Sequence, residues 1–269
     1  MSDGRDIKEM VKDKYGAIAT QSKQQSQSSC CGGSSCCSTG DFSVMAEDYT
    51  RLSGYVSDAD LGLGCGLPTE FAQIKPGHTV VDLGSGAGND CFVARSIVGE
   101  TGRVIGIDMT EEMISKAREN AQKLRFANVE FRFGDIESMP IDNDIADVVV
   151  SNCVMNLVPD KKKAFSETFR ILKRGGHCSI SDIVLKGELP HSLRKSAELY
   201  AGCISGAQQM DEYLKTIKDA GFTNVTVQKE REITIPNELM QSHLTLDELR
   251  DFRTRRVGIF SITVYADKP

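Results

Sequence analysis

The sequence predicts an α/β fold built on a doubly wound, mostly parallel β-sheet. Short apolar segments alternate with amphipathic segments over residues 78–184, which is the pattern of successive βαβ units. A glycine-rich turn at residues 84–88 directly follows the first apolar segment, where open parallel sheets bind their ligands. The pattern changes after Leu185, and we expect residues 186–269 to form a smaller α+β substrate domain.

The expected strands are short apolar runs. They lie at residues 78–83, 104–107, 129–133, 145–150, 178–184, 224–228 and 259–266. We expect the last two of these strands to lie at sheet edges.

Apolar residues that recur every three or four positions predict the helices. The expected helices are residues 6–19, 68–72, 89–98, 110–124, 161–172, 193–203 and 211–220. Gly175 and Gly176 are expected to stop the helix that ends at Leu172. Tyr15 and Gly16 leave two interpretations open: the first helix is a lid over the cofactor, or it simply ends with a glycine at its C-cap.

Three units are expected along the chain. Residues 20–40 are almost wholly Gln, Ser, Gly and Cys and cannot bury a core, so we expect residues 1–41 to be a flexible, Cys-rich N-terminal arm. Residues 42–185 are the expected cofactor-binding domain. Residues 186–269 are the expected substrate-binding cap.

Composition narrows the function classes. The chain has 269 residues and a net charge of -6, and its Lys and Arg residues are scattered, so we expect no nucleic-acid partner. No apolar run resembles a membrane span or a signal peptide, so we expect a cytoplasmic protein without a membrane partner. In a reducing compartment its nine cysteines are expected to be ligands, nucleophiles or core thiols.

The glycine turn favours an adenosyl cofactor. Its glycines, Gly84, Gly86 and Gly88, have the spacing GxGxG and not the GxGxxG of a nicotinamide site, and Asp82 precedes them. This pattern favours S-adenosylmethionine.

Two further acids follow the next two expected strands. Asp108 is placed to accept hydrogen bonds from ribose hydroxyls, and Asp135 is placed to meet the adenine amino group while Ile136 packs on the ring. Any one of these acids is equally well explained as a turn or N-cap residue. Three acids after three successive strands favour a ligand site.

Residues 78–184 resemble the class I S-adenosylmethionine methyltransferases, which have a Rossmann-like fold. The motifs that carry the resemblance are Val-Asp-Leu-Gly-Ser-Gly-Ala-Gly, Gly-Ile-Asp-Met-Thr and Gly-Asp-Ile-Glu. We expect the cofactor to be bound by Asp82, Gly84, Ser85, Gly86, Gly88, Asp108, Met109, Asp135, Ile136 and Asn152.

The cysteine motifs resemble those of the arsenite methyltransferases, essentially from end to end. They are Leu-Gly-Cys-Gly-Leu-Pro around Cys65, Ser-Asn-Cys-Val-Met-Asn around Cys153, Gly-Cys-Ile-Ser-Gly-Ala around Cys203, and Ser-Cys-Cys-Gly at residues 29–32. The resemblance implies that Cys65, Cys153 and Cys203 bind trivalent arsenic, as arsenite or methylarsenite, in arsenic detoxification. It also implies that an N-terminal cysteine, assigned here as Cys31, takes part in redox turnover or substrate capture; Cys30, Cys36 and Cys37 remain open alternatives.

The chemistry of thiolates agrees with this resemblance. Soft thiolates suit soft ions, and three of them can hold arsenic(III) as a pyramid whose lone pair points at a methyl donor. No general base is needed, because arsenic has no proton to lose. Methyl transfer formally oxidises arsenic, so thiols must return the electrons, and an external thiol reductant of the thioredoxin or glutathione type is expected to open the resulting disulfide.

The remaining cysteines have different expected roles, and two alternative functions remain open. Cys91 and Cys178 are expected to be buried core thiols without a role, whereas the motifs around Cys65 and Cys153 are expected to expose their thiols. The alternatives are a methyltransferase of a small organic acceptor, since this fold accommodates many acceptors, and a thiol-based metalloid-binding protein.

Overall fold

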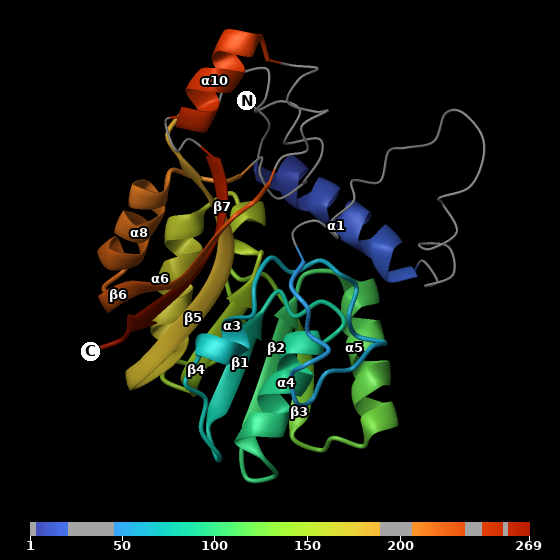
Figure 1. Cartoon of the computed structure of the whole chain (residues 1–269). Helices are drawn as coiled ribbons and strands as arrows, with labels where there is room; N and C mark the ends of the chain where they lie inside the picture. The colour runs from blue at the N-terminus through green and yellow to red at the C-terminus, as the bar shows by residue number, and fades with distance from the viewer. Residues whose placement is uncertain (1–3, 21–45, 189–205, 235–243, 255–257) are drawn as a thin grey trace, which may run out of the picture.

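A seven-stranded sheet with the strand order β3-β2-β1-β4-β5-β7-β6 forms the centre of the protein (Figure 1). The computed structural model describes residues 4–20, 46–188, 206–234, 244–254 and 258–269. The strands β1 to β5 pair in parallel, and β7 pairs antiparallel with both β5 and β6. The predicted doubly wound, mostly parallel sheet is therefore confirmed.

The strands lie close to the predicted positions. Their bounds are β1 Thr79–Leu83, β2 Arg103–Asp108, β3 Val129–Phe133, β4 Ala146–Asn152, β5 Leu172–Lys186, β6 Thr223–Glu232 and β7 Gly258–Asp267. The expectation of an edge position holds for β6 and is wrong for β7, which has a neighbour on each side. The burial patterns explain the difference: β7 is buried along almost all of its length, whereas β6 alternates between exposed and half-buried residues, as an edge strand does.

The helices also agree with the predicted pattern. Their bounds are α1 Gly4–Thr20, α3 Pro68–Phe71, α4 Asn89–Val98, α5 Glu111–Leu124, the 3₁₀ helix η3 Met155–Leu157, α6 Lys161–Ile171, α8 Met210–Asp219 and α10 Leu246–Thr254. The sequence analysis did not predict α10. The helix expected at 193–203 lies outside the described residues.

The predicted stop signal at Gly175 and Gly176 is wrong. Helix α6 ends at Ile171, and β5 begins at the next residue with an extended backbone. Both glycines lie within β5, where an added Cβ at Gly176 would come 2.9 Å from the carbonyl oxygen of Asp147. These glycines therefore allow β5 to bulge against β4; they do not end the helix.

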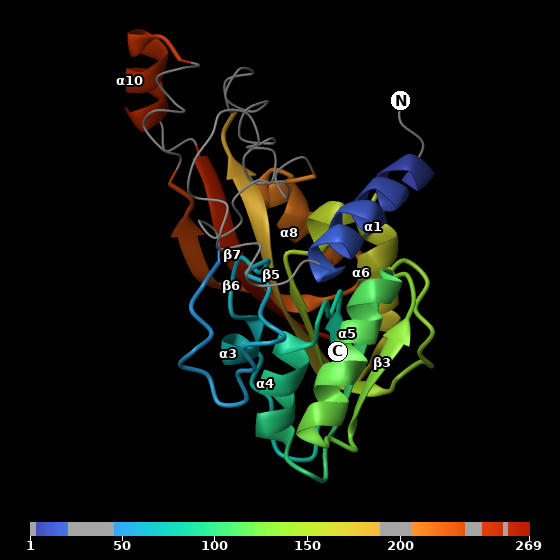
Figure 2. The same ribbon diagram turned by 90° about the vertical axis from the view of Figure 1, so that its right-hand side faces the viewer.

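Helices cover both faces of the sheet (Figures 1 and 2). On one face α4 and α5 pack over β1, β2 and β3, with Phe92 buried among them. On the other face α6 and α8 pack over β5 and β6, and the rings of Phe165 and Tyr213 meet edge to face with centroids 5.7 Å apart. The sheet is thus buried on both sides, as a parallel sheet requires.

Helix α1 lies against α5 and η3, at the end of the sheet where the parallel strands finish (Figure 1). Lys116 of α5 donates a hydrogen bond to the carbonyl oxygen of Ala19. Gly16 lies inside the helix and close to Glu112, so the interpretation of Gly16 as the end of the helix is wrong.

Residues 186–269 contribute β6 and β7 to the same sheet as the rest of the chain. The division of the chain into an N-terminal arm, a cofactor-binding domain and a substrate-binding cap, with boundaries at residues 41 and 185, stays a prediction. Within the described part of the chain, no helix combines the length and the apolar character that crossing a membrane requires.

Replacement of Phe165 by alanine is expected to lower the free energy of unfolding by about 3–5 kcal/mol, because the ring is fully buried and leaves a cavity against Tyr213. Urea denaturation followed by circular dichroism measures this loss. Met10→Ala is the control, since the Met10 side chain is 64% exposed, and its effect is expected to stay within about 0.5 kcal/mol. Equal losses in the two variants would contradict the assignment of Phe165 to the core.

Candidate active site

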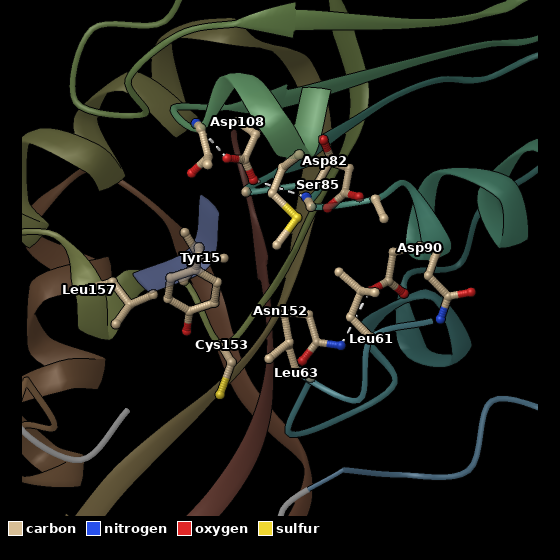
Figure 3. Close-up of a pocket in the computed structure, with 18 of the residues that line it drawn as sticks. Tyr15, Leu61, Leu63, Asp82, Ser85, Asp90, Asp108, Asn152, Cys153 and Leu157 are labelled. Carbon is tan, nitrogen blue, oxygen red and sulfur yellow. Dashed lines mark hydrogen bonds between the residues drawn. The ribbon is translucent and has the colours of Figure 1, made fainter. Parts of the chain in front are cut away.

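A pocket opens at the carboxyl ends of β1, β2 and β4, beneath α1 (Figure 3). Its empty volume is about 1010 Å³ with the open mouth included. The residues expected to bind the cofactor or substrate that line it are Asp82, Gly84, Ser85, Gly86, Asp108, Met109, Asp135, Ile136, Asn152 and Cys153. Val11 and Tyr15 of α1 also line it, so the lid interpretation of this helix agrees with the structure.

The glycine turn shapes the floor of the pocket. Gly84 and Gly86 have φ angles of 66° and 50°, which favour glycine, and an added Cβ at Gly84 would collide with Val154. Gly88 has a different role: it is the N-cap of α4, does not line the pocket, and packs against Phe92 and Phe131. The third glycine of the turn therefore allows the helix to pack closely on the sheet.

Two buried polar atoms in this pocket suit a polar ligand. The hydroxyl oxygen of Ser85 and the amide oxygen of Asn89 have no hydrogen-bond partner among the described residues, although both residues line the pocket. Unsatisfied buried oxygens cost free energy, and a bound ligand that donates hydrogen bonds would remove that cost.

Two buried acids interact across the glycine turn: Asp82 near the end of β1, and Asp90 in the first turn of α4. Asp82 of β1 accepts a hydrogen bond from the thiol of Cys91 at 3.2 Å, and burial together with the nearby Asp90 raises the pKa of Asp82 well above its usual range. Burial likewise raises the pKa of Asp90 to about 6, although hydrogen bonds from Tyr49 and Asn152 oppose the rise. A cationic ligand in the pocket would favour the ionised form of both acids.

Asp108, at the end of β2, holds the glycine turn in place. One of its carboxylate oxygens accepts a hydrogen bond from the Gly86 amide at 2.9 Å, and the other accepts one from the Thr110 amide at 2.8 Å. Burial raises the pKa of Asp108 despite these bonds. Asp108 therefore acts as a turn residue, which was the alternative explanation for this acid. Its carboxylate also lines the pocket in which the ribose is expected to bind.

Asp135 is joined to helix α1. Lys8 of α1 donates hydrogen bonds to Asp135 at 2.5 Å and to Glu137 at 2.6 Å. Burial is the largest single effect and acts to raise the pKa of Asp135, but the hydrogen bond and charge of Lys8, together with the Glu137 amide and Lys163, outweigh it and the pKa is lowered. Ile136 is buried at the pocket wall between the two acids, so the predicted adenine-binding pair lies in the pocket with Asp135 already bound to a lysine.

Cys153 directly follows β4 and lines the pocket. Its φ of 62° is unusual for a residue with a side chain, and its amide donates a hydrogen bond to the carbonyl oxygen of Ser181 at 2.8 Å. Strained backbone of this kind is concentrated at functional sites.

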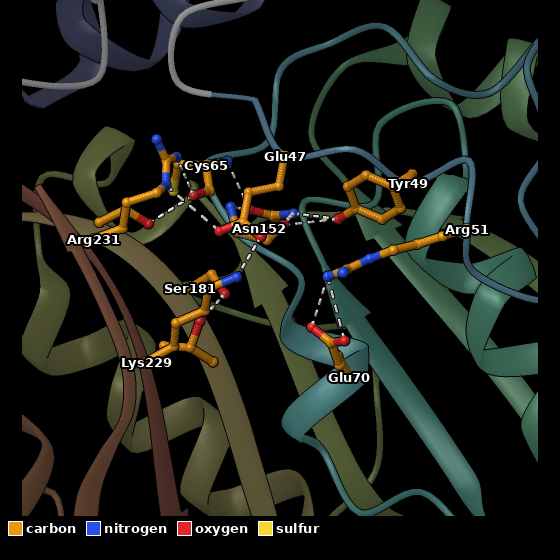
Figure 4. A network of polar contacts seen from close by, with 12 residues as sticks. Glu47, Tyr49, Arg51, Cys65, Glu70, Asn152, Ser181, Lys229 and Arg231 are labelled. Carbon is orange, nitrogen blue, oxygen red and sulfur yellow. Dashed lines mark hydrogen bonds and ion pairs between the residues drawn. The ribbon is translucent and has the colours of Figure 1, made fainter. Parts of the chain in front are cut away.

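Cys65 lies on a loop that is held from two sides (Figure 4). Asn152 accepts hydrogen bonds from the amides of Cys65 and Gly66 at 3.0 and 3.2 Å, and the hydroxyl of Ser261 donates to the Cys65 carbonyl oxygen at 2.6 Å. The expectation that these motifs expose their thiols is wrong, because Cys65 is 0% and Cys153 only 3% exposed. The flanking glycines instead allow the Cys65 loop to approach its neighbours closely: an added Cβ at Gly64 would come 2.5 Å from Asn152.

The remaining cysteines divide into two groups. Cys91 and Cys178 are buried in the core, as predicted, and burial raises the pKa of Cys178 to about 12. Cys31 and Cys203 lie outside the described residues, as do Cys30, Cys36 and Cys37.

The sequence analysis missed Lys8, Tyr49 and Asp90. Asp90 had a local signal, because it stands in the first turn of the helix that follows the glycine turn. Lys8 and Tyr49 had none, since each meets its partner only when distant parts of the chain fold together.

The chain is similar to known methyltransferases over most of its length. The methyltransferase-domain family matches residues 74–221. An arsenite methyltransferase of Halobacterium salinarum is 42% identical over 245 residues, which cover 86% of this chain and 61% of that protein. The human arsenite methyltransferase is 38% identical over 191 residues, which cover 66% of this chain and 49% of that protein.

A solved structure extends this similarity to the fold. An arsenic(III) S-adenosylmethionine methyltransferase from Chlamydomonas reinhardtii is 33% identical, with a TM-score of 0.64 over 76% of this chain and 67% of that one. The chain belongs to the arsenite methyltransferase family of the class I methyltransferases. It spans 61% of the length of the Halobacterium relative and about half of the human one.

Replacement of Lys8 by methionine is expected to loosen the lid helix, because it removes the ion pairs with Asp135 and Glu137. Hydrogen–deuterium exchange of the α1 amides is expected to become about twofold to fivefold faster at pH 7, the range for a partly exposed pair. Lys215→Met, which removes the exposed pair with Asp219 on α8, is the control and is expected to leave α1 unchanged.

The same contact predicts a pH dependence in the unmodified protein. Lys8 lowers the pKa of Asp135 in the folded protein. The stabilisation of the fold by the Lys8–Asp135 ion pair is therefore complete above the unfolded pKa of about 3.9, and it is lost as the pH falls through the lower folded pKa. Unchanged α1 exchange in Lys8→Met would show that other contacts hold the helix.

Proposed function

We propose that this protein transfers methyl groups from S-adenosylmethionine to trivalent arsenic, with arsenite and methylarsenite as substrates. The observation that carries the proposal is that Cys153, which lines the pocket, is joined to the Cys65 loop through its neighbour Asn152. These two cysteines of the family motifs are far apart in the sequence, yet Asn152 precedes one of them and binds the backbone of the other. Sequence similarity to arsenite methyltransferases supports the same conclusion.

The residues of the pocket fit S-adenosylmethionine. The cofactor supplies an electrophilic methyl group when it is bound. Asp108 would accept hydrogen bonds from the ribose, and Asp135 and Ile136 would contact the adenine. Asp82 lines the pocket and would lie near the cationic end of the molecule, whose positive charge would favour the ionised form of this buried carboxyl group. Ser85 and Asn89 have buried oxygens that still lack donors among the described residues.

The substrate would be held by thiolates. Three-coordinate arsenic(III) suits Cys65, Cys153 and Cys203, and the third of these belongs to a segment outside the described residues. The burial of Cys65 and Cys153 would exclude water from the bound arsenic and keep its lone pair free for attack. Holding both reactants in line can contribute roughly 7–11 kcal/mol to a two-body reaction.

The reaction needs a reductant but no general base. Formation of the arsenic–carbon bond uses the arsenic lone pair and raises arsenic from the trivalent to the pentavalent state. Two protein thiols would return the two electrons and form a disulfide, and an external thiol of the thioredoxin or glutathione type would reduce it. Cys31 is the proposed N-terminal participant, and the proposed setting is arsenic detoxification in the cytoplasm.

Asp108→Ala is expected to weaken S-adenosylmethionine binding by well over tenfold, because two charge-assisted hydrogen bonds to the ribose are lost. Isothermal titration calorimetry measures the affinity, and a thermal melt checks the fold, since Asp108 also binds the amides of Gly86 and Thr110. Asp219→Ala on the exposed face of α8 is the control. An unchanged dissociation constant in Asp108→Ala would show that the ribose lies elsewhere.

The decisive experiment is mass-spectrometric detection of methylated arsenic after the reduced protein is mixed with arsenite, S-adenosylmethionine and a thiol. We expect at least stoichiometric product, with S-adenosylhomocysteine formed beside it. Cys153→Ser is expected to abolish the product but keep cofactor binding, whereas Cys178→Ala removes another buried thiol and is expected to stay active.

The two other functions give different results in this experiment. Cofactor binding without methylated arsenic would favour a small organic acceptor. Tight arsenite binding without S-adenosylhomocysteine release would favour a metalloid-binding protein. Full activity of Cys153→Ser would exclude the proposed thiolate site.

A further inference from the structure

We propose that Asn152 is a positioning residue that fixes the Cys65 thiol relative to Cys153, and not a direct contact of the cofactor. The proposal rests on the function proposed above, because the two thiols matter only if they hold the substrate together. It assigns a role to a hydrogen-bond network in which the side chains of Asn152, Tyr49 and Asp90 meet the backbone of Cys65 and Gly66.

The amide oxygen of Asn152 is fully used by the Cys65 loop. It accepts hydrogen bonds from the amides of Cys65 and Gly66 at 3.0 and 3.2 Å, so both of its lone pairs are engaged. The amide nitrogen donates to the carbonyl oxygen of Gly66 at 2.8 Å. One side chain therefore binds this short loop through both its amide oxygen and its amide nitrogen.

A second layer holds the Asn152 side chain itself. Its nitrogen also donates to the hydroxyl oxygen of Tyr49 at 2.5 Å, and that hydroxyl donates to Asp90 at 2.8 Å. The chain of donors runs from Asn152 through Tyr49 to a buried carboxyl group, and successive hydrogen bonds of this kind strengthen one another. The orientation of Asn152 is thus determined by groups outside the Cys65 loop.

The main chain connects this network to the second thiol. Asn152 is the last residue of β4, and Cys153 follows it with a positive φ. Cys153 is anchored to Ser181 of β5, and the Cys65 carbonyl is anchored to Ser261 of β7, the strand that pairs with β5. Both thiol-bearing segments therefore rest on the same strand pair, and Asn152 is the side chain that ties one segment to the other.

The glycines of the Cys65 motif agree with this role. An added Cβ at Gly64 would lie 2.5 Å from the Asn152 nitrogen, and one at Gly66 would lie 2.5 Å from the Ser181 hydroxyl. The loop approaches Asn152 and β5 so closely that only glycine fits on either side of Cys65.

The test compares two affinities in the reduced, full-length protein. Asn152→Ala is expected to weaken arsenite binding by about tenfold or more, the loss expected for two or more hydrogen bonds that orient a thiol. Affinity for S-adenosylhomocysteine is expected to stay within about threefold. Isothermal titration calorimetry measures both affinities, with arsenite and S-adenosylhomocysteine as the probes.

Asn128→Ala is the matched control. Asn128 also binds two backbone groups of a loop, the carbonyl oxygens of Gly99 and Gly102, but it does not line the pocket. It is expected to change neither affinity.

Tyr49→Phe removes only the hydroxyl that supports Asn152. It is expected to weaken arsenite binding relative to the unmodified protein and to leave S-adenosylhomocysteine binding unchanged, so it tests the proposal even if Asn152→Ala does not fold.

A double-mutant cycle with Cys65→Ser separates positioning from general destabilisation. If Asn152 acts through Cys65, Asn152→Ala has little further effect on arsenite affinity in the Cys65→Ser background. Additive losses, or an equal loss of S-adenosylhomocysteine affinity, would overturn the inference. Unchanged arsenite affinity in Cys65→Ser alone would instead contradict the proposed thiolate site, so the two failures are distinguishable.

Discussion

The parallel pairing of β1 with β2 and with β4 is the constraint on which the rest of the site depends. Parallel strands finish at the same edge, so the glycine turn after β1, Asp108 at the end of β2 and Asn152 at the end of β4 meet in one place. The turn can then approach a ligand through its backbone, and Asp108 fixes the turn by binding the Gly86 amide. Without this common edge, none of these residues would share a pocket.

Burial gives the pocket its chemical character. Asp82 and Asp90 are withdrawn from water, which raises the pKa of both, and a cationic ligand would favour their ionised forms. The two thiols are equally withdrawn from water, which suits a soft metalloid. The proposed reaction needs no side chain as a general base. It depends instead on side chains that position the reactants and exclude water from them.

Helix α1 and the Cys65 loop are joined to this edge by side-chain contacts between distant segments. Lys8 connects α1 to the acids after β3, and Asn152 connects the Cys65 loop to β4. Neither contact has a signature in the sequence, because a lysine and an asparagine in such positions are ordinary surface or turn residues. Their partners are decided by how α1 and the segment around residue 65 fold back over the sheet.

The sequence alone determined the fold class, most strands and helices to within a few residues, and the presence of Asp82, Asp108 and Asp135 at one edge of the sheet, because these depend on local periodicity and on the order of strands. It misjudged the glycines at 175 and 176 and the exposure of Cys65 and Cys153, because a glycine permits both an open turn and a close approach. Tertiary structure alone decided that β7 lies inside the sheet, that Gly88 packs on Phe92 and Phe131, and that Asn152 holds the Cys65 loop. The physical reason is common to all three: each depends on which distant segment fills the neighbouring space.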